Sequence, residues 1–206
     1  WTLDTRVLYM NSTLVQKSGW SSPIVTMTDL VKGAEAVQES GANGWGANGA
    51  DAHRLYKKIL PFMWTFGGDV LDANGRPILN SQENVKALLT YAQLARTGFI
   101  ETQRQLDAAF IQGKVAFWIS GSWLNKKINA ATSLKVTPIL VPGLKGEPGI
   151  SFAGGEYLAV SATTKNTQLS RDFVLFLTKG TNAVRFCAKV PEAGFPAEKG
   201  SFADPS

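Results

Sequence analysis

The chain has 206 residues, 44% of them hydrophobic and 18% charged, a composition that supports a folded core and excludes a disordered chain. Its formal net charge is +5, but the basic residues are scattered or in short pairs such as Lys57-Lys58, which is typical of a solvated surface and argues against nucleic-acid binding. The single cysteine, Cys187, excludes an internal disulfide bond and is expected to pack in the core, and no apolar run reaches the roughly 20 residues of a membrane span.

The chain opens with a predicted strand followed by a predicted helix. Residues 5–10, TRVLYM, form a short apolar run that is typical of a strand. Thr26 followed three residues later by Asp29 has the spacing of a helix cap, and Gly41 predicts the end of that helix.

Glycine and asparagine dominate the next segment. Residues 41–50, GANGWGANGA, predict a loop, and Asp51 predicts the cap of a following helix that bends or ends near Pro61. Residues 71–80, LDANGRPILN, predict a polar turn between short extended pieces.

Two further capped helices are predicted in the middle of the chain. Ser81 predicts the start of a helix that closes at Gly98, and the spacing of its apolar residues predicts a buried face made of Val85, Leu88, Leu89 and Ala92. Thr102 and Gln105 form a capping box for the next helix, which Gly113 ends. The residues of this helix that we expect to face inward are Leu106, Ala109 and Phe110.

The rest of the chain alternates between predicted strands and helices. Strands are expected at 115–119, near 135–140 and at 154–164, and helices from about Ser122 and over most of 167–189. This interleaving predicts an α/β fold.

Several kinds of chemistry are missing from the sequence. It has no phosphate-binding loop, its glycine pairs lack the dinucleotide-binding spacing, and His53 is its only histidine. We therefore expect no metal and no nucleotide cofactor. No serine has the nucleophile-elbow context, whereas a pair of distant carboxylates for glycoside hydrolysis stays open.

The aromatic content suits sugar binding, because sugar rings pack their C–H faces on aromatic rings while their hydroxyls need hydrogen-bond partners. The chain has six tryptophans. Those that adjoin Gly, Ser or Thr at an expected element end are Trp20, Trp45, Trp64 and Trp123. Each could equally be a core-edge residue. Trp123 follows Ser120-Gly121-Ser122, and such small residues leave the backbone N–H groups of a helix start accessible to a ligand.

The order of motifs resembles the extracellular solute-binding proteins of carbohydrate ABC importers, the maltose-binding-protein-like family. The matching stretches are RVLYMN, TMTDLVKGAEAV, LPFMWTFGGDVLD, NSQENVKALLTYAQL, AAFIQGKVAFWISGSW and FAGGEYLAVSATTKN followed by DFVLFLT. The resemblance implies a periplasmic-binding-protein-like fold of two lobes that close on a ligand by hinge motion. It implies a C-terminal lobe at 8–150, a hinge crossing at 151–157, part of the N-terminal lobe at 158–189 and a return crossing at 190–206.

The resemblance also implies where a ligand would bind. It places Trp123 at the position of a cleft tryptophan and puts Glu156 beside the middle crossing, where a carboxylate can accept hydrogen bonds from hydroxyls. The ligand-contact residues it implies are Ser120, Gly121, Ser122, Trp123, Gly155, Glu156, Trp64, Asp51, His53, Arg54 and Tyr157. Several have plainer readings: Glu156 as a solvated charge, His53 as a surface residue and Tyr157 as hinge packing.

The resemblance implies sugar capture for the permease subunits of an importer, in the periplasm or outside the cell, free or as a membrane-anchored lipoprotein. The alternatives are a sugar-sensing protein for a membrane receptor and a carbohydrate-active enzyme that uses Glu156 and Asp51. Compared with the family, the opening half of the N-terminal lobe and the last helices are missing, so we expect a fragment. We also expect its segment 155–189, which would lack partners, to associate with a second copy or fold back on the chain.

Overall fold

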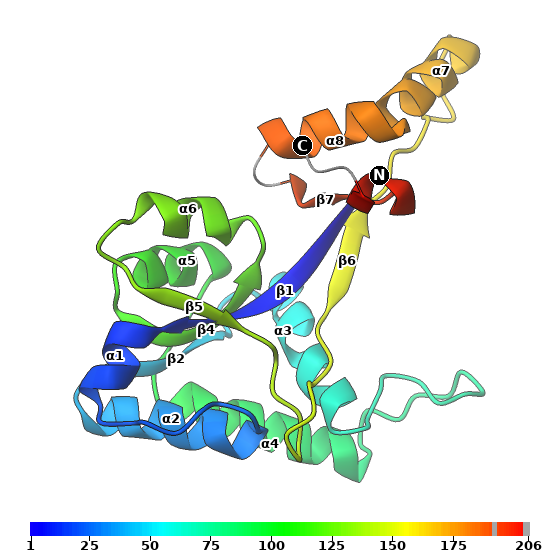
Figure 1. Cartoon of the computed structure of the whole chain (residues 1–206). Coiled ribbons are helices and arrows are strands. Elements are labelled where there is room, and N and C mark those ends of the chain that lie inside the picture. Colours follow the sequence, from blue (N-terminus) through cyan, green and yellow to red (C-terminus); the bar gives the residue numbers. More distant parts are fainter. Residues whose placement is uncertain (191–192, 204–206) are drawn as a thin grey trace. The chain divides into compact units, whose positions relative to one another are not determined.

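The structure, a computed structural model, describes residues 1–190 and 193–203, with only the backbone described for Phe202 and Ala203. The chain divides into two compact units (Figure 1). The first unit contains Trp1–Thr5, Gly121–Lys126 and the chain from Ala153 onward, and the second contains Arg6–Ser120 and Lys127–Phe152. The α/β fold class predicted from the sequence is confirmed.

Strands and helices are interleaved along the chain. The strands are β1 Thr2–Asn11, β2 Asn43–Asn48, β3 Phe99–Glu101, β4 Val115–Gly121, β5 Val136–Ile139, β6 Ala153–Glu156 and β7 Phe195–Pro196. The helices are α1 Ser12–Lys17, α2 Met27–Glu39, α3 Ala52–Thr65, α4 Gln82–Arg96, α5 Gln103–Ile111, α6 Leu124–Ala130, α7 Thr167–Thr178 and α8 Gly180–Lys189, with a short 3₁₀ helix, η2, at Lys199–Ala203.

The second unit is built on a mixed sheet with the strand order β3-β2-β4-β1-β5. β2 runs parallel to both β3 and β4, while β5 pairs antiparallel with the Leu8–Asn11 half of β1. In such sheets ligands bind outside the carboxyl ends of the parallel strands. The carboxyl ends of β2 and β4 lie at Asn48 and Gly121, so the chain segments that follow these two residues are the natural place for a site.

Helices cover both faces of this sheet. Figure 1 shows α2 and α4 on one side of it and α5 on the other. The core between the sheet and the α2, α3 and α4 layer includes Leu8, Leu30, Trp45, Phe62, Leu94 and Phe117. Both predicted capping boxes are present, at Thr26 with Asp29 and at Thr102 with Gln105. The predicted inward residues of α5, Leu106, Ala109 and Phe110, are buried.

The predicted Gly/Asn loop at 41–50 is wrong, because residues 43–48 form β2, the central parallel strand. Its glycines are there for close packing. A Cβ on Gly44 would overlap the backbone of Ala34 in α2, and one on Gly46 would lie 3.0 Å from Leu106 and 3.3 Å from Trp118. The strand therefore reads as a loop by composition while its small residues let helices approach on both faces.

The predicted buried face of the helix that follows Ser81 is also wrong. Val85, Leu88 and Leu89 are exposed, with 64% of Leu89 accessible. The buried residues of α4 are Asn84, Ala87, Tyr91 and Leu94, which form a neighbouring stripe that also has helical spacing. The helix predicted to bend or end near Pro61 does not end there, because α3 continues to Thr65 with Pro61 inside it.

The first unit holds a smaller sheet. The Thr2–Thr5 half of β1 pairs antiparallel with β6, and Thr2 and Leu3 pair with β7. The strand predicted at 154–164 is shorter than expected: only Ala153–Glu156 is paired, because β1 begins at Thr2, opposite Glu156. The predicted return crossing at 190–206 is partly outside the described residues, namely at 191–192 and 204–206.

The helices of the first unit bury little of their apolar surface. α7 has no buried residue, and 59% of Phe173 and 55% of Phe176 are exposed. In α8 the ring of Phe186 contacts that of Trp1, with centroids 4.4 Å apart. Cys187 is partly rather than fully buried, and this burial raises the pKa of its thiol. Across the described part of the chain, no helix combines the length and apolar character that crossing a membrane requires.

Candidate functional site

The start of α3 presents three of the predicted site residues. Asp51 is the N-cap position of the helix, but its side chain makes no capping bond within the described chain. Its carboxylate instead lies 3.6 Å from the guanidinium of Arg54. His53 is exposed and its ring lies edge-on to Tyr56, with centroids 6.5 Å apart. The three side chains therefore lie at the surface directly after the carboxyl end of β2.

Three aromatic rings gather along α3. Trp64 lies nearly parallel to Phe152, with an interplanar angle of 8° and centroids 6.2 Å apart. Tyr56, two helical turns before Trp64, meets the same phenylalanine edge-on at 6.0 Å. We call Tyr56, Trp64 and Phe152 the aromatic platform. It is partly exposed, because 45% of Tyr56 remains accessible and the other two rings are half-buried.

Two cations lie against this aromatic platform. The guanidinium carbon of Arg6 is 5.6 Å from the centroid of Phe152, and Lys57 Nζ is 5.9 Å from it. Lys57 Nζ is also 5.8 Å from the centroid of Tyr56. Aromatic faces combined with side-chain donors are the groups that a polyol or sugar needs.

Trp64 has a second, polar contact. Its indole Nε1 donates a hydrogen bond of 3.0 Å to Asp69 Oδ1. This bond, followed by a weaker contribution from the N–H of Val70, holds the pKa of the Asp69 carboxyl below its usual value. This hydrogen bond and the stacking on Phe152 restrain the rotation of the Trp64 ring.

Trp123 is half-buried and folds over the backbone that precedes it. A Cβ on Gly121 would overlap three atoms of the Trp123 ring, so only glycine permits this arrangement. Ser120 is fully buried and its hydroxyl donates to Asp107 Oδ1 at 2.7 Å, so its side chain is not at the surface. Ser122 Oγ is buried and has no hydrogen-bond partner among the described residues.

The remaining predicted residues lie on β6 and just after it. Gly155 pairs with Leu3, and a Cβ there would overlap the carbonyl of Thr2. Glu156 is exposed, and its backbone oxygen accepts a 2.9 Å hydrogen bond from the amino terminus of Trp1. Tyr157 is 94% exposed, which does not fit the reading of this residue as hinge packing.

The predicted residues thus fall into two groups on different units. In the second unit, Asp51 precedes α3, His53, Arg54 and Trp64 lie on it, and Ser120 lies in β4. The predicted residues of the first unit are Gly121, Ser122, Trp123, Gly155, Glu156 and Tyr157. Two other candidate tryptophans have core roles: Trp45 is 1% exposed, and Trp20 packs against the core of the second unit. Among the residues that the structure describes, no group of three or more His, Cys, Asp or Glu side chains is placed to hold a metal ion.

Sequence reasoning missed Tyr56 and Phe152. Tyr56 could have been found from its position eight residues before Trp64, since this spacing puts both rings on one helical face. Phe152 gives no comparable signal, because it is far from α3 in the sequence.

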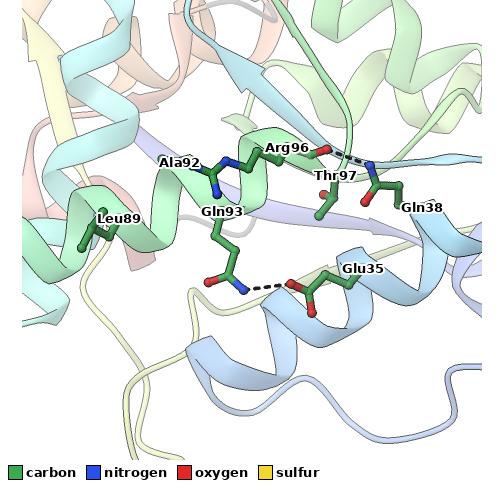
Figure 2. A pocket seen from close by; sticks show the side chains of 7 residues that line it. All are labelled: Glu35, Gln38, Leu89, Ala92, Gln93, Arg96 and Thr97. Carbon is green, nitrogen blue, oxygen red and sulfur yellow. Dashed lines mark hydrogen bonds between the residues drawn. The ribbon is translucent and has the colours of Figure 1, made fainter.

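A pocket of about 380 Å³ lies elsewhere in the second unit, between α2 and α4. Figure 2 shows its lining, which consists of Glu35, Gln38, Leu89, Ala92, Gln93, Arg96 and Thr97. Gln93 donates to Glu35 and Gln38 donates to the backbone oxygen of Arg96, so part of its polar surface joins the two helices (Figure 2). None of the predicted site residues lines it.

The chain is similar to known binding proteins in sequence and in structure. A probable ABC transporter-binding protein of Deinococcus radiodurans is 27% identical over 193 residues, which are 86% of this chain and 46% of that protein. The solute-binding protein of an Agrobacterium radiobacter ABC transporter, solved with ribitol, matches 99% of this chain and 54% of its own at 26% identity and a TM-score of 0.80. The match to maltose-bound MalE3 of T. maritima covers 100% of this chain and 55% of that chain, at 23% identity and a TM-score of 0.83.

The chain therefore spans about half the length of the relatives it matches. The structural matches confirm the predicted periplasmic-binding-protein-like fold over essentially the whole chain. The sequence also matches the family described as bacterial extracellular solute-binding protein over residues 1–205. The chain belongs to the family of bacterial extracellular solute-binding proteins.

Proposed function

We propose that the protein containing this chain binds a sugar or a related polyol and delivers it to a membrane ABC importer. The observation that carries the proposal is the aromatic platform at the surface of the second unit, with the partly exposed Lys57 beside it and the buried Arg6 against Phe152. Flat apolar faces bordered by hydrogen-bond donors match the alternating C–H and O–H surfaces of a sugar. Relatives with the same fold have been solved with maltose, laminaribiose, tagatose and ribitol.

Each unit offers candidate ligand contacts of its own. In the second unit, Trp64 and Tyr56 offer aromatic contact area, and Asp51, His53 and Arg54 supply polar groups from the start of α3. In the first unit, Trp123 offers a stacking ring and the exposed carboxylate of Glu156 can accept hydrogen bonds from hydroxyls. The other proposed contacts of the first unit are Gly121, Ser122, Gly155 and Tyr157. Ser120 contributes by structure instead of direct contact, because its side chain is buried.

The two units are proposed to be the C-terminal lobe and part of the N-terminal lobe of a protein that closes by hinge motion. The chain passes between them at Thr5–Arg6, Ser120–Gly121, Lys126–Lys127 and Phe152–Ala153. The first and last of these links lie in or beside a pair of antiparallel strands, since Thr5 pairs with Ala153. In this proposal the permease subunits of an importer receive the closed protein, in the periplasm or, for a lipoprotein, at the outer face of a membrane.

Calorimetry on the whole protein that contains this chain tests the proposal. Maltose, laminaribiose, tagatose and ribitol form the first panel, and glycerophosphocholine, found in a structural relative, is the non-sugar comparison. We expect saturable binding of at least one sugar or polyol and a loss of affinity in Trp64→Ala. Binding of glycerophosphocholine with no response to the sugar panel would overturn the assignment of ligand class.

We propose further that the protein does no chemistry on its ligand. Of the two carboxylates that an enzyme reading would use, Asp51 is engaged by Arg54. Chromogenic glycosides should therefore remain intact with the purified protein. Turnover that disappears in both Glu156→Gln and Asp51→Asn variants would establish an enzyme instead.

A further inference from the structure

A buried polar cluster lies at the carboxyl end of β4, on the sheet face that α5 covers. Asp107 of α5 is 8% exposed, and a single oxygen, Oδ1, accepts three hydrogen bonds. The donors are Gln103 Nε2 at 2.9 Å, Trp118 Nε1 at 2.8 Å and Ser120 Oγ at 2.7 Å. Gln103 Nε2 also donates to Ser120 Oγ at 3.0 Å.

The cluster links two side chains of β4, at alternate positions, to α5. Trp118 and Ser120 point to the same side of β4, because side chains two residues apart share a face. Both are essentially inaccessible to solvent, as is Gln103, which is 3% exposed. Hydrogen bonds to a charged acceptor in such surroundings are stronger than those between neutral groups. The end of β4 is thus held by its side chains as well as by backbone pairing.

The location of this anchor matters because Ser120 is the last residue of the second unit before the chain enters the first. Gly121, Ser122 and Trp123 follow directly. Gly121 must stay free of a Cβ for the Trp123 ring to lie over it. The path of these three residues therefore starts from a point whose position Asp107 fixes through Ser120.

We infer that Asp107 is a positioning residue for the proposed sugar site: by holding Ser120 it sets where the Gly121–Ser122–Trp123 segment leaves the sheet. This inference rests on the function proposed above, since Trp123 is a ligand contact only in that proposal. The negative charge of Asp107 also reaches Tyr9, where it adds to burial in raising the pKa of the phenol. The carboxylate acts on side chains of β1 as well as β4, which suits an anchor at the centre of the sheet.

The test uses Ser120→Ala, Asp107→Asn and the double variant in the whole protein that contains this chain. Ser120→Ala removes the two hydrogen bonds of the Ser120 hydroxyl, to Asp107 and from Gln103, and keeps the bonds that Gln103 and Trp118 donate to Asp107. A matched control is Asn11→Ala, which removes a buried polar cap of α1. Asn11 lies near Gly113, two residues before the opposite end of β4.

Two readouts separate the possible outcomes. In the ligand-free protein, amide hydrogen exchange of residues 121–124 should quicken in Ser120→Ala and Asp107→Asn but not in Asn11→Ala. For the sugar of the panel that binds the unmodified protein best, each single variant should weaken affinity by about tenfold. The double variant should lose about tenfold as well, because Asp107→Asn weakens, by removing the charge of the acceptor, the same hydrogen bond that Ser120→Ala removes.

Each result has a distinct meaning. Unchanged exchange at 121–124 would overturn the inference whatever the ligand result. Losses that multiply to about a hundredfold in the double variant would also overturn it, since Ser120 and Asp107 would then act independently. Failure of the unmodified protein to bind any sugar would defeat the proposed function, while the exchange measurement would still decide whether Asp107 holds the segment.

Discussion

Replacing Gly121 with alanine should remove Trp123 from its present place without changing the tryptophan itself. The Cβ of an alanine at 121 would occupy the position of the Trp123 ring, so the ring has to move. If Trp123 stacks on the ligand, the expected loss equals that of truncating an aromatic anchor, about 1–3 kcal/mol or about 5- to 150-fold in Kd. The forced overlap should also lower the free energy of unfolding by about 1–3 kcal/mol.

Calorimetry with the best-bound sugar and urea unfolding measure the two effects. Gly200→Ala is the matched control, because a Cβ there meets no atom within 4 Å. Gly121→Ala, Trp123→Ala and their double variant should all bind equally weakly, since each removes the same ring from the same place. A Gly121→Ala protein with the affinity and near-ultraviolet dichroism of the unmodified protein would refute the packing of Trp123 on Gly121.

Four further predictions concern stability, its pH dependence, the ionisation of Asp69 and self-association. Tyr91→Phe should lower the free energy of unfolding, measured by urea titration, by about 1–3 kcal/mol. The reason is that the buried backbone N–H of Asn48 loses the Tyr91 hydroxyl oxygen that accepts its hydrogen bond at 3.2 Å. The control Tyr56→Phe, at an exposed tyrosine, should change the free energy of unfolding little. Burial raises the pKa of Tyr91 above its ordinary value of 10, so the stability that its neutral hydroxyl contributes is complete below about pH 10 and is lost as the pH rises further. The decrease in the free energy of unfolding above pH 10 should therefore be smaller in Tyr91→Phe than in the unmodified protein. An equal decrease in both proteins would contradict this. Trp64→Phe should raise the pKa of Asp69 towards its ordinary value in a carboxyl NMR titration, because the ring stays and the Nε1 donor goes; an unchanged pKa would show that the bond is not made in solution. Replacing both Phe173 and Phe176 with serine should reduce self-association of the isolated chain in sedimentation experiments, because both rings are more than half exposed. The control Leu140→Ser, at a 71% exposed site of the other unit, should not reduce it. Equal effects of the two changes would exclude a role specific to α7.

Local capping chemistry was the most predictable part of the fold. The Thr26–Asp29 and Thr102–Gln105 boxes depend on residues three apart, and both helices begin where these pairs predict. The face of α4 was not predictable in the same way. Two neighbouring stripes have helical spacing, and the choice between them depends on distant partners of Tyr91 and Asn84, such as Asn48 and the carbonyl of Asp69.

The same division between local and distant contacts applies to the candidate site. The sequence indicated Asp51, His53, Arg54 and Trp64, which all lie on or next to one helix. It did not indicate Phe152, whose ring joins Tyr56 and Trp64 from almost a hundred residues along the chain. Nor did it distinguish Trp45, which fills the core, from Trp64, which lies at the surface, because both follow or precede small residues in similar contexts.

The pairing of the ten-residue strand β1 restricts how many residues can be inserted within it. Its first half pairs with β6 and β7, and its second half pairs with β5, without a break between Thr5 and Arg6. Successive side chains of a strand alternate between faces, so one residue inserted at this junction would exchange the inner and outer positions of one half relative to the other. Two inserted residues would restore the alternation. Length variants at this junction should therefore be tolerated in even steps and rejected in odd ones.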